Sequence, residues 1–132
     1  MRPEGVLEVA LYATDLKAVE SFYTEVLGLA VQEKTEGRHV FFRCGYVMIL
    51  VFNPDVTSKT GGVVPPHGTI GAGHMAFSIK SGDFEHWREH LSKHNVAIEK
   101  DVDWGQGGHS VYFRDPAGNS IELTTPKTWG IE

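Results

Sequence analysis

Residues 111–123 read VYFRDPAGNSIEL, which is an alternating stretch, a turn and a second alternating stretch. The period of two between apolar and polar letters predicts strands over residues 109–114 and 119–125. Between them, Asp-Pro-Ala-Gly at 115–118 places proline at its preferred second turn position. The segment therefore predicts a β-hairpin that brings two strands together near the end of the chain.

The letters of this hairpin have a counterpart in the first half of the chain. Residues 40–43 read VFFR and residues 111–114 read VYFR. Around each of these segments the apolar pattern predicts the same order of elements, namely a strand, a helix and three strands. An internal repeat of this kind is the strongest guide to a fold. We therefore predict an α+β fold of two βαβββ modules, over residues 5–53 and 71–125.

The two predicted modules together form a single domain over residues 1–132. Residues 54–70 are rich in Pro, Gly, Ser and Thr, so we expect a linker that belongs to a long loop without regular structure. A short tail follows residue 125. The expected strands are 6–13, 29–34, 39–44, 46–52, 74–80, 96–102, 109–114 and 119–125. Two helices are expected: the first follows an N-cap at Thr14 or Asp15 and ends at Gly28, and the second spans residues 83–94.

Composition excludes several classes of protein. The chain has 132 residues, of which 41% are apolar and 22% charged, and 12 basic against 17 acidic residues give a net charge of −5. An acidic chain is a poor partner for nucleic acid or an anionic membrane. There is neither a long apolar run nor a basic-then-apolar start, which predicts a cytoplasmic protein. The single Cys44 excludes an internal disulfide and a multi-thiolate metal site.

Aligning the modules reveals a candidate metal site. Glu8 takes the position of His74 in the opening strands, and Ile49 takes the position of Glu122 in the closing strands. Strand alternation turns Glu8, His74 and Glu122 away from the helices, onto the face that a curved sheet would make concave. Because a carboxylate in an apolar strand is costly unless its charge is compensated, a divalent cation held by these three side chains is predicted.

Each of these residues also has a simpler interpretation. His74 could be a hydrogen-bonded core histidine, Glu122 could pair with Arg114, and Glu8 could pair with a cation at a pocket rim. A dinucleotide-binding motif has its glycines between a strand and a helix. The glycines at 105, 107 and 108 do not lie in such a place, so this motif is excluded.

At these residues the chain resembles the vicinal oxygen chelate superfamily, which includes glyoxalase I, bleomycin- and fosfomycin-resistance proteins, extradiol dioxygenases and methylmalonyl-CoA epimerase. The motifs that carry the resemblance are VALYATDLKAVESFYTEVLGL at 9–29, AGHMAFSI at 72–79 and VYFRDPAGNSIEL at 111–123. It implies paired βαβββ modules that form an open, barrel-like mixed sheet around a metal or ligand. It also implies a homodimer.

The resemblance further implies a metal-dependent enzyme, of lyase, isomerase or dioxygenase type, that binds a small oxygen-bearing substrate and stabilises an oxyanion or enolate. Its ligands would be Glu8, His74 and Glu122, with Glu8 and Glu122 also candidates for catalytic base and with Fe, Mn, Zn or Mg as the metal. Ile49 stands where four-ligand members have a further ligand. The alternative function is a metal-free, small-molecule binding protein of the bleomycin-resistance type.

Several other side chains are candidate substrate contacts. Tyr12, Ser110 and Tyr112 share the strand face of the predicted ligands, although structural packing would explain them equally. Arg114, with Arg43, could form an anion clamp. His67 in the long loop is either solvated or a fourth ligand or proton shuttle. The remaining strand-end histidines, His39 and His109, are expected at the surface.

Overall fold

The computed structural model describes residues 1–131, and the chain divides after Gly71 into two compact units. Unit 1 contains β1 (Glu8–Tyr12), α1 (Leu16–Ser21), a π-helical turn (Phe22–Val26), β2 (Ala30–Thr35), β3 (His39–Cys44), β4 (Val47–Phe52) and α2 (Pro54–Thr57). Unit 2 contains β5 (His74–Ser78), a 3₁₀ turn (Ser81–Asp83), α3 (Phe84–Lys93), β6 (Lys100–Gly105), β7 (Gly108–Arg114), β8 (Ser120–Thr124) and a 3₁₀ turn (Pro126–Trp129).

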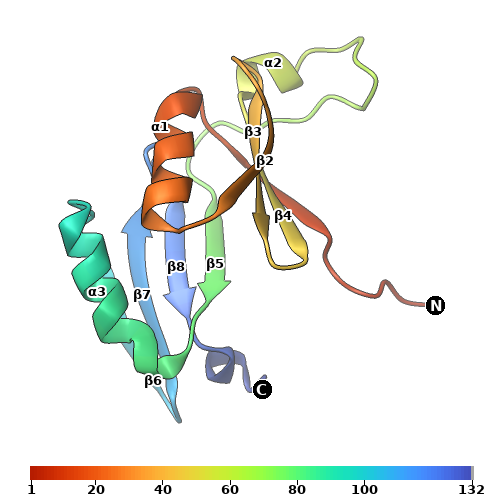
Figure 1. The fold of residues 1–132 in the computed structure, drawn as a ribbon. Helices are drawn as coiled ribbons and strands as arrows, with labels where there is room; N and C mark the ends of the chain where they lie inside the picture. Colours follow the sequence, from red (N-terminus) through yellow and green to blue (C-terminus); the bar gives the residue numbers. More distant parts are fainter. Residues whose placement is uncertain (132) are drawn as a thin grey trace. The chain divides into compact units, whose positions relative to one another are not determined.

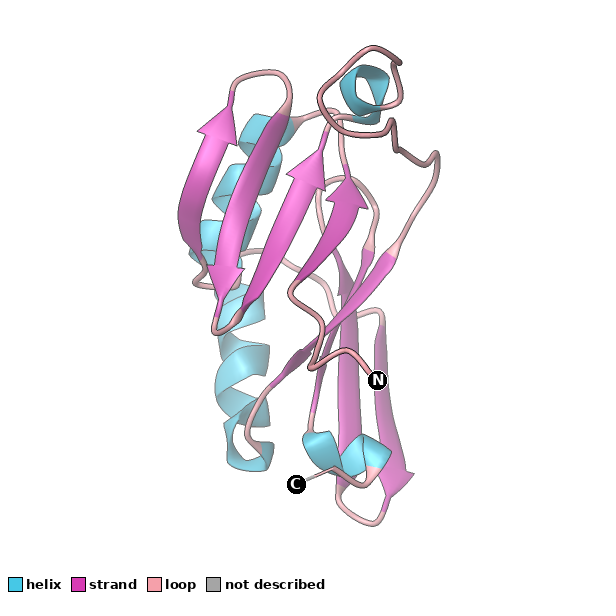
Figure 2. Cartoon of the chain, turned by 90° about the vertical axis from the view of Figure 1, so that its right-hand side faces the viewer, coloured by secondary structure: helices cyan, strands magenta, loops and turns pink. Residues whose placement is uncertain are grey.

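Each unit forms one mixed four-stranded sheet, with strand order β1-β4-β3-β2 in unit 1 and β5-β8-β7-β6 in unit 2 (Figure 1). The first and last strands of each module pair in parallel, and the other neighbours are antiparallel. Figure 2 shows the four strands of each sheet lying side by side. The predicted α+β architecture of two βαβββ modules is confirmed. No helix within residues 1–131 combines the length and apolar character needed to cross a membrane.

Strand alternation decides which side chains form the core of each unit. In unit 1, α1 contacts β3 and β4, and Tyr23 stacks on Phe42 with ring centroids 5.2 Å apart. In unit 2, Val111, Phe113 and Ile121 are fully buried, and Leu123 is 1% exposed. The opposite face of each sheet is therefore free to carry polar side chains, as the period of two predicts.

The boundaries of three predicted elements need correction. The first helix begins after Asp15, whose Oδ1 accepts a hydrogen bond from the Ala18 amide at 3.1 Å, but its second half is π-helical rather than α-helical. The predicted loop contains one helical turn, α2, started by Asn53 as N-cap. The strand expected at 96–102 lies instead at Lys100–Gly105, because a bulge next to Asp103 extends it beyond the alternating letters.

The strand register also corrects the alignment of the modules. Glu8 pairs with Met48 and His74 pairs with Ser120, so Glu122 corresponds to Leu50 and not to Ile49. The antiparallel pairs Phe41–Leu50 and Tyr112–Glu122 give the same answer. Ile49 is a core residue, 4% exposed. The error arose from a shift of one residue, which in a strand exchanges the two faces.

The turn before β8 fixes the start of β5. Asp115 accepts hydrogen bonds through Oδ1 from the Ala117 and Asn119 amides, both at 2.9 Å. Asn119, 1% exposed, donates through Nδ2 to Asp115 Oδ2 at 2.9 Å, and its Oδ1 accepts from the Gly73 amide at 2.7 Å. This buried network places His74, the next residue, against β8.

We expect Asn119→Ala to lower the free energy of unfolding by about 1–3 kcal/mol, because it leaves buried polar groups of Asp115 and Gly73 without these hydrogen bonds. Urea denaturation followed by circular dichroism measures the change. The control Glu99→Gln removes an exposed ion pair with Arg114 and should cost at most about 1 kcal/mol. Equal losses in the two variants would contradict a structural role for the network.

Candidate functional site

The centre of the candidate site in unit 2 is the pair His74 and Glu122. These residues lie on the parallel strands β5 and β8, on the sheet face opposite the buried Ile121 and Leu123. His74 Nε2 lies 3.2 Å from Glu122 Oε2. The imidazole is half-exposed, whereas the Glu122 residue is only 8% exposed. The structure thus brings together two of the three predicted metal ligands.

The hydrogen bond on the other side of the His74 ring determines which tautomer the neutral ring adopts. His74 Nδ1 lies 3.0 Å from the carbonyl oxygen of Ser120, and a carbonyl only accepts hydrogen bonds. Nδ1 therefore carries the proton, and in the neutral ring Nε2 presents its lone pair to the Glu122 carboxylate. Two acceptors at 3.2 Å repel each other unless a cation or a proton lies between them. A ring nitrogen that donates to a backbone carbonyl is also the usual arrangement behind a metal-binding histidine.

The second oxygen of Glu122 is held from inside the sheet. Ser110, which is fully buried on β7, donates its hydroxyl to Glu122 Oε1 at 2.5 Å. Trp104 Nε1 in turn donates to Ser110 Oγ at 2.9 Å, and Thr124 Oγ1 lies 2.8 Å from the same oxygen. Each donor of this chain supports the next, so the carboxylate has a fixed orientation with Oε2 directed at His74.

Tyr112 completes this group of side chains. It pairs with Glu122 across β7 and β8, and its ring lies over the His74 ring with centroids 6.2 Å apart. Burial raises the pKa of the Tyr112 hydroxyl. A hydrogen bond with Ser110 opposes the shift, while a hydrogen bond with Glu122 and the negative charge of Glu122 raise the pKa further. The Tyr112 hydroxyl is therefore a neutral hydrogen-bond donor at physiological pH.

The contacts of His74 and Glu122 suit the binding of a cation. A buried carboxylate needs compensation, and the donor set of one imidazole nitrogen and one carboxylate oxygen fits Zn, Fe or Mn. Within residues 1–131 no three His, Cys, Asp or Glu side chains converge on one point, so a metal-ligand role for the pair remains a prediction. The proton-sharing alternative, an ion pair between protonated His74 and Glu122, has the same geometry.

Glu8, the third predicted ligand, lies on β1 in unit 1. It is exposed and borders a shallow hollow of about 430 Å³ on the face of the sheet that also carries Leu50. The lining combines apolar with charged side chains. Its lining consists of Glu8, Gln32, Glu33, Phe41, Arg43, Gly45, Tyr46, Met48 and Leu50. A ligand role for Glu8 remains a prediction.

Tyr12 and His67 form a second pair, within unit 1. The Tyr12 hydroxyl lies 2.7 Å from His67 Nδ1, and the His67 ring meets Phe52 edge-on at 4.6 Å. The loop backbone is held as well, because the His67 amide donates to the Thr57 carbonyl at 2.9 Å. His67 is therefore an ordered contact of the sheet face, and its substrate role remains a prediction.

The surface position predicted for His39 is wrong. The residue is only 5% exposed, and its ring stacks on Phe41 at 3.9 Å. Arg38 donates to His39 Nδ1 at 2.6 Å, and His39 Nε2 contacts Glu33 Oε1 at 3.0 Å. The signal was available in the sequence, since His39 shares strand parity with the aromatic Phe41.

The two arginines predicted as an anion clamp have partners within their own units. Arg114 pairs with Glu99 at 3.0 Å and donates to the Gly118 carbonyl at 3.0 Å, so it does not pair with Glu122. Arg43 Nε donates to the Gly45 carbonyl at 3.1 Å. An anionic substrate would have to compete with these contacts, and a role for either arginine in binding remains a prediction.

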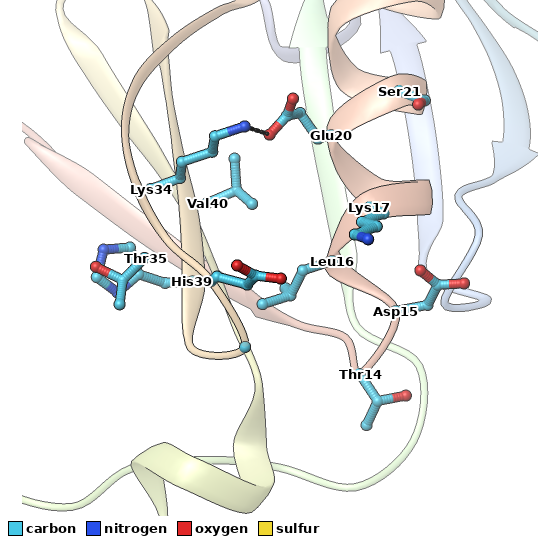
Figure 3. Close-up of a pocket in the computed structure, with 12 residues that line it drawn as sticks. Thr14, Asp15, Leu16, Lys17, Glu20, Ser21, Lys34, Thr35, His39 and Val40 are labelled. Carbon is cyan, nitrogen blue, oxygen red and sulfur yellow. Dashed lines mark hydrogen bonds and ion pairs between the residues drawn. The ribbon is translucent and has the colours of Figure 1, made fainter.

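A larger hollow of about 680 Å³ lies elsewhere in unit 1, between α1 and the β2–β3 hairpin. Figure 3 shows Lys34 and Glu20 joined across it, with a distance of 2.8 Å between Nζ and Oε1. This ion pair neutralises two of the five charged side chains that line the hollow, the others being Asp15, Lys17 and Glu36, and the hollow contains none of the predicted site residues. Its size alone does not identify a functional site.

Trp104 is the residue that sequence reasoning missed. Its strand was expected to end at residue 102, which left Trp104 in a loop. A register shift between Asp103 and Gly105 makes Trp104 the extra residue of a β-bulge, and its indole reaches Ser110. A tryptophan followed by the glycine-rich letters GQGG was the available signal, because bulges and tight turns require glycine.

Comparisons with known proteins identify relatives of the whole chain. The model of the Glyoxalase/Bleomycin resistance protein/Dioxygenase superfamily matches residues 5–123. A lactoylglutathione lyase structure from Agrobacterium tumefaciens is 40% identical, with a TM-score of 0.95 and coverage of 99% of this chain and all of that one.

Two curated relatives carry different activities in their names. The putative ring-cleaving dioxygenase MhqE of Bacillus subtilis is 32% identical over 82% of this chain, which spans only 37% of that protein. The metallothiol transferase FosB of Staphylococcus saprophyticus is 27% identical over 92% of this chain and 77% of its own length.

The raised pKa of Tyr112 gives a test of the site geometry. We expect Glu122→Gln to lower the pKa of Tyr112, because the variant removes a negative charge that disfavours tyrosinate, while burial keeps the pKa above its ordinary value. Alkaline titration of tyrosinate absorbance in the presence of a chelator, with Tyr112→Phe to assign the signal, measures the shift. An unchanged titration would mean that Glu122 does not act on Tyr112.

Proposed function

The chain belongs to the Glyoxalase/Bleomycin resistance protein/Dioxygenase superfamily, and we propose that it is a metal-dependent enzyme in which His74 and Glu122 bind a divalent metal ion. The observation that carries the proposal is the approach of His74 Nε2 to Oε2 of the nearly buried Glu122, with a distance of 3.2 Å between the two atoms. The Ser120 carbonyl on one side and Ser110 on the other hold both groups in that arrangement.

The remaining ligands must come from outside this pair. Glu8 is our proposal for the third, on the sequence argument that it takes the position of His74 in the first module. Leu50, at the position of Glu122, has no ligating atom. A metal ion with two or three protein ligands retains coordination positions for water and substrate, which is typical of catalytic rather than structural sites.

We propose a small, oxygen-bearing molecule as the substrate. When bound, the metal would supply Lewis-acid stabilisation of negative charge on a substrate oxygen. Tyr112 holds a neutral hydroxyl that is hydrogen-bonded to Glu122, and we propose that it donates to such an oxygen when the substrate binds. Glu122 is occupied at both oxygens, so the exposed Glu8 is the better candidate for a general base.

The relatives support this class of reaction without selecting one member. A lyase, a ring-cleaving dioxygenase and a thiol transferase share the family, and one fold hosts many chemistries through changes at the site. Tyr12, His67 and Arg114 are proposed to contact the part of the substrate that differs between these reactions. We also propose a cytoplasmic homodimer.

Metal content decides between an enzyme and a metal-free binding protein. We expect the purified protein to bind one Mn²⁺ per chain, as counted by the loss of the free Mn²⁺ paramagnetic resonance signal, and His74→Ala and Glu122→Gln to lose that binding while remaining folded. Elemental analysis identifies the native metal. His86→Ala, an exposed histidine on α3, is the control. A folded wild-type protein that binds no Mn²⁺ would overturn the proposal in favour of a bleomycin-resistance type of function.

The role of Ser110 can be tested separately. Ser110→Ala removes the hydroxyl that orients Glu122, so we expect the dissociation constant for Mn²⁺ to rise by about tenfold to a hundredfold, the usual effect of losing such a supporting hydrogen bond. Ser78→Ala changes an exposed serine of β5 on the same sheet and should leave the constant unchanged. Equal affinities for the Ser110 variant and the wild type would show that the bond does not support a ligand.

A further inference from the structure

Three of the seven histidines of the chain lie four residues apart in unit 2, outside the site described above. His86 and His90 belong to α3, and His94 is its C-cap residue. Residues four apart on a helix lie on the same face, one turn above each other. Nothing in the proposed enzyme function uses this row of imidazoles.

The last two members of the row are in direct contact. The ring centroids of His90 and His94 are 4.4 Å apart, at an interplanar angle of 50°. His94 is exposed and His90 half-buried, so solvent reaches the pair. Two histidines at this spacing on one helix face are the arrangement with which many zinc sites begin.

The tautomer of the neutral His94 ring favours metal binding. His94 Nδ1 lies 2.9 Å from the carbonyl oxygen of His90, so Nδ1 donates and Nε2 of the neutral ring carries the lone pair. This is the same relation between ring and carbonyl that His74 has with Ser120. It fixes the ring by a bond to its own helix and leaves the other nitrogen as an acceptor.

The position in the helix also favours a cation. His90 lies in the last turn of α3, at the negative end of the helix dipole. The neighbouring Lys93 opposes a cation, but its exposed ammonium group lies on a long flexible chain that can turn into solvent. The row differs from the catalytic HExxH motif in one position: the buried Leu91 stands where that motif has its glutamate base.

We infer that His90 and His94 form a surface metal site, separate from the proposed catalytic metal, that binds a late first-row divalent cation such as Ni²⁺, Cu²⁺ or Zn²⁺. Imidazole nitrogen suits these ions, and water fills the remaining positions. Because no general base accompanies the pair, the site binds metal and does not hydrolyse. His86 is not a member, since no three ligating side chains converge within residues 1–131.

Calorimetric titration with Ni²⁺ tests the site in the untagged His74→Ala/Glu122→Gln protein, where the proposed catalytic ligands are absent. We expect one Ni²⁺ per chain, and His90→Gln or His94→Gln should each weaken binding by about a hundredfold, the effect of losing one of two linked contacts. The matched control is His86→Ala, which should bind as before. Ni²⁺ should also raise the thermal midpoint only where both histidines are present.

Three results would overturn the inference: no Ni²⁺ binding in the folded double variant, binding that survives His94→Gln, or an equal loss in His86→Ala. Each of these outcomes leaves the Mn²⁺ site untouched. Conversely, a wild-type protein without Mn²⁺ binding would remove the proposed enzyme function but not the helix site. The two metals thus report on separate residues.

Discussion

A carboxylate that is almost completely buried must have its charge compensated, and this requirement organises the candidate site of unit 2. Glu122 is 8% exposed in a strand whose neighbours are core residues. Ser110 and His74 approach its two oxygens, while Trp104 and the Ser120 carbonyl support these partners in turn. Such a network is costly when one member is unsatisfied, so the identity of each residue depends on the others.

The first module shows what happens where the charge is absent. Leu50 occupies the position of Glu122, and the pair His39 and Phe52 takes the place of Ser110 and Thr124. Aromatic rings there replace the hydroxyls, with Phe52 edge-on to Phe41 at 5.2 Å. One backbone pattern therefore carries a polar network in one copy and an aromatic cluster in the other. The two modules thus share the register of their strands but differ in the side chains on this sheet face.

Sequence reasoning predicted what depends on period and repeat. The alternation of letters placed His74, Glu122, Ser110 and Tyr112 on one face, because that face is a direct consequence of strand geometry. It failed where one residue was added or shifted. The bulge at Trp104 and the alignment of Glu122 with Leu50, rather than Ile49, both depend on a register that only strand pairing can determine. The burial of His39 likewise depended on the aromatic partners that its strand brings to it.

The charge of the site connects the structure to the family. A proton on His74 would compensate Glu122 in a simple ion pair, in which Nδ1 donates to the Ser120 carbonyl and Nε2 to Glu122. A protein that needed only a stable sheet could use Leu at position 122, as the first module does with Leu50. Retaining a buried glutamate, with a fully buried serine that serves to orient it, is costly for stability alone. The cost is understandable if Glu122 Oε2 and His74 Nε2 are directed at a cation that takes part in the reaction.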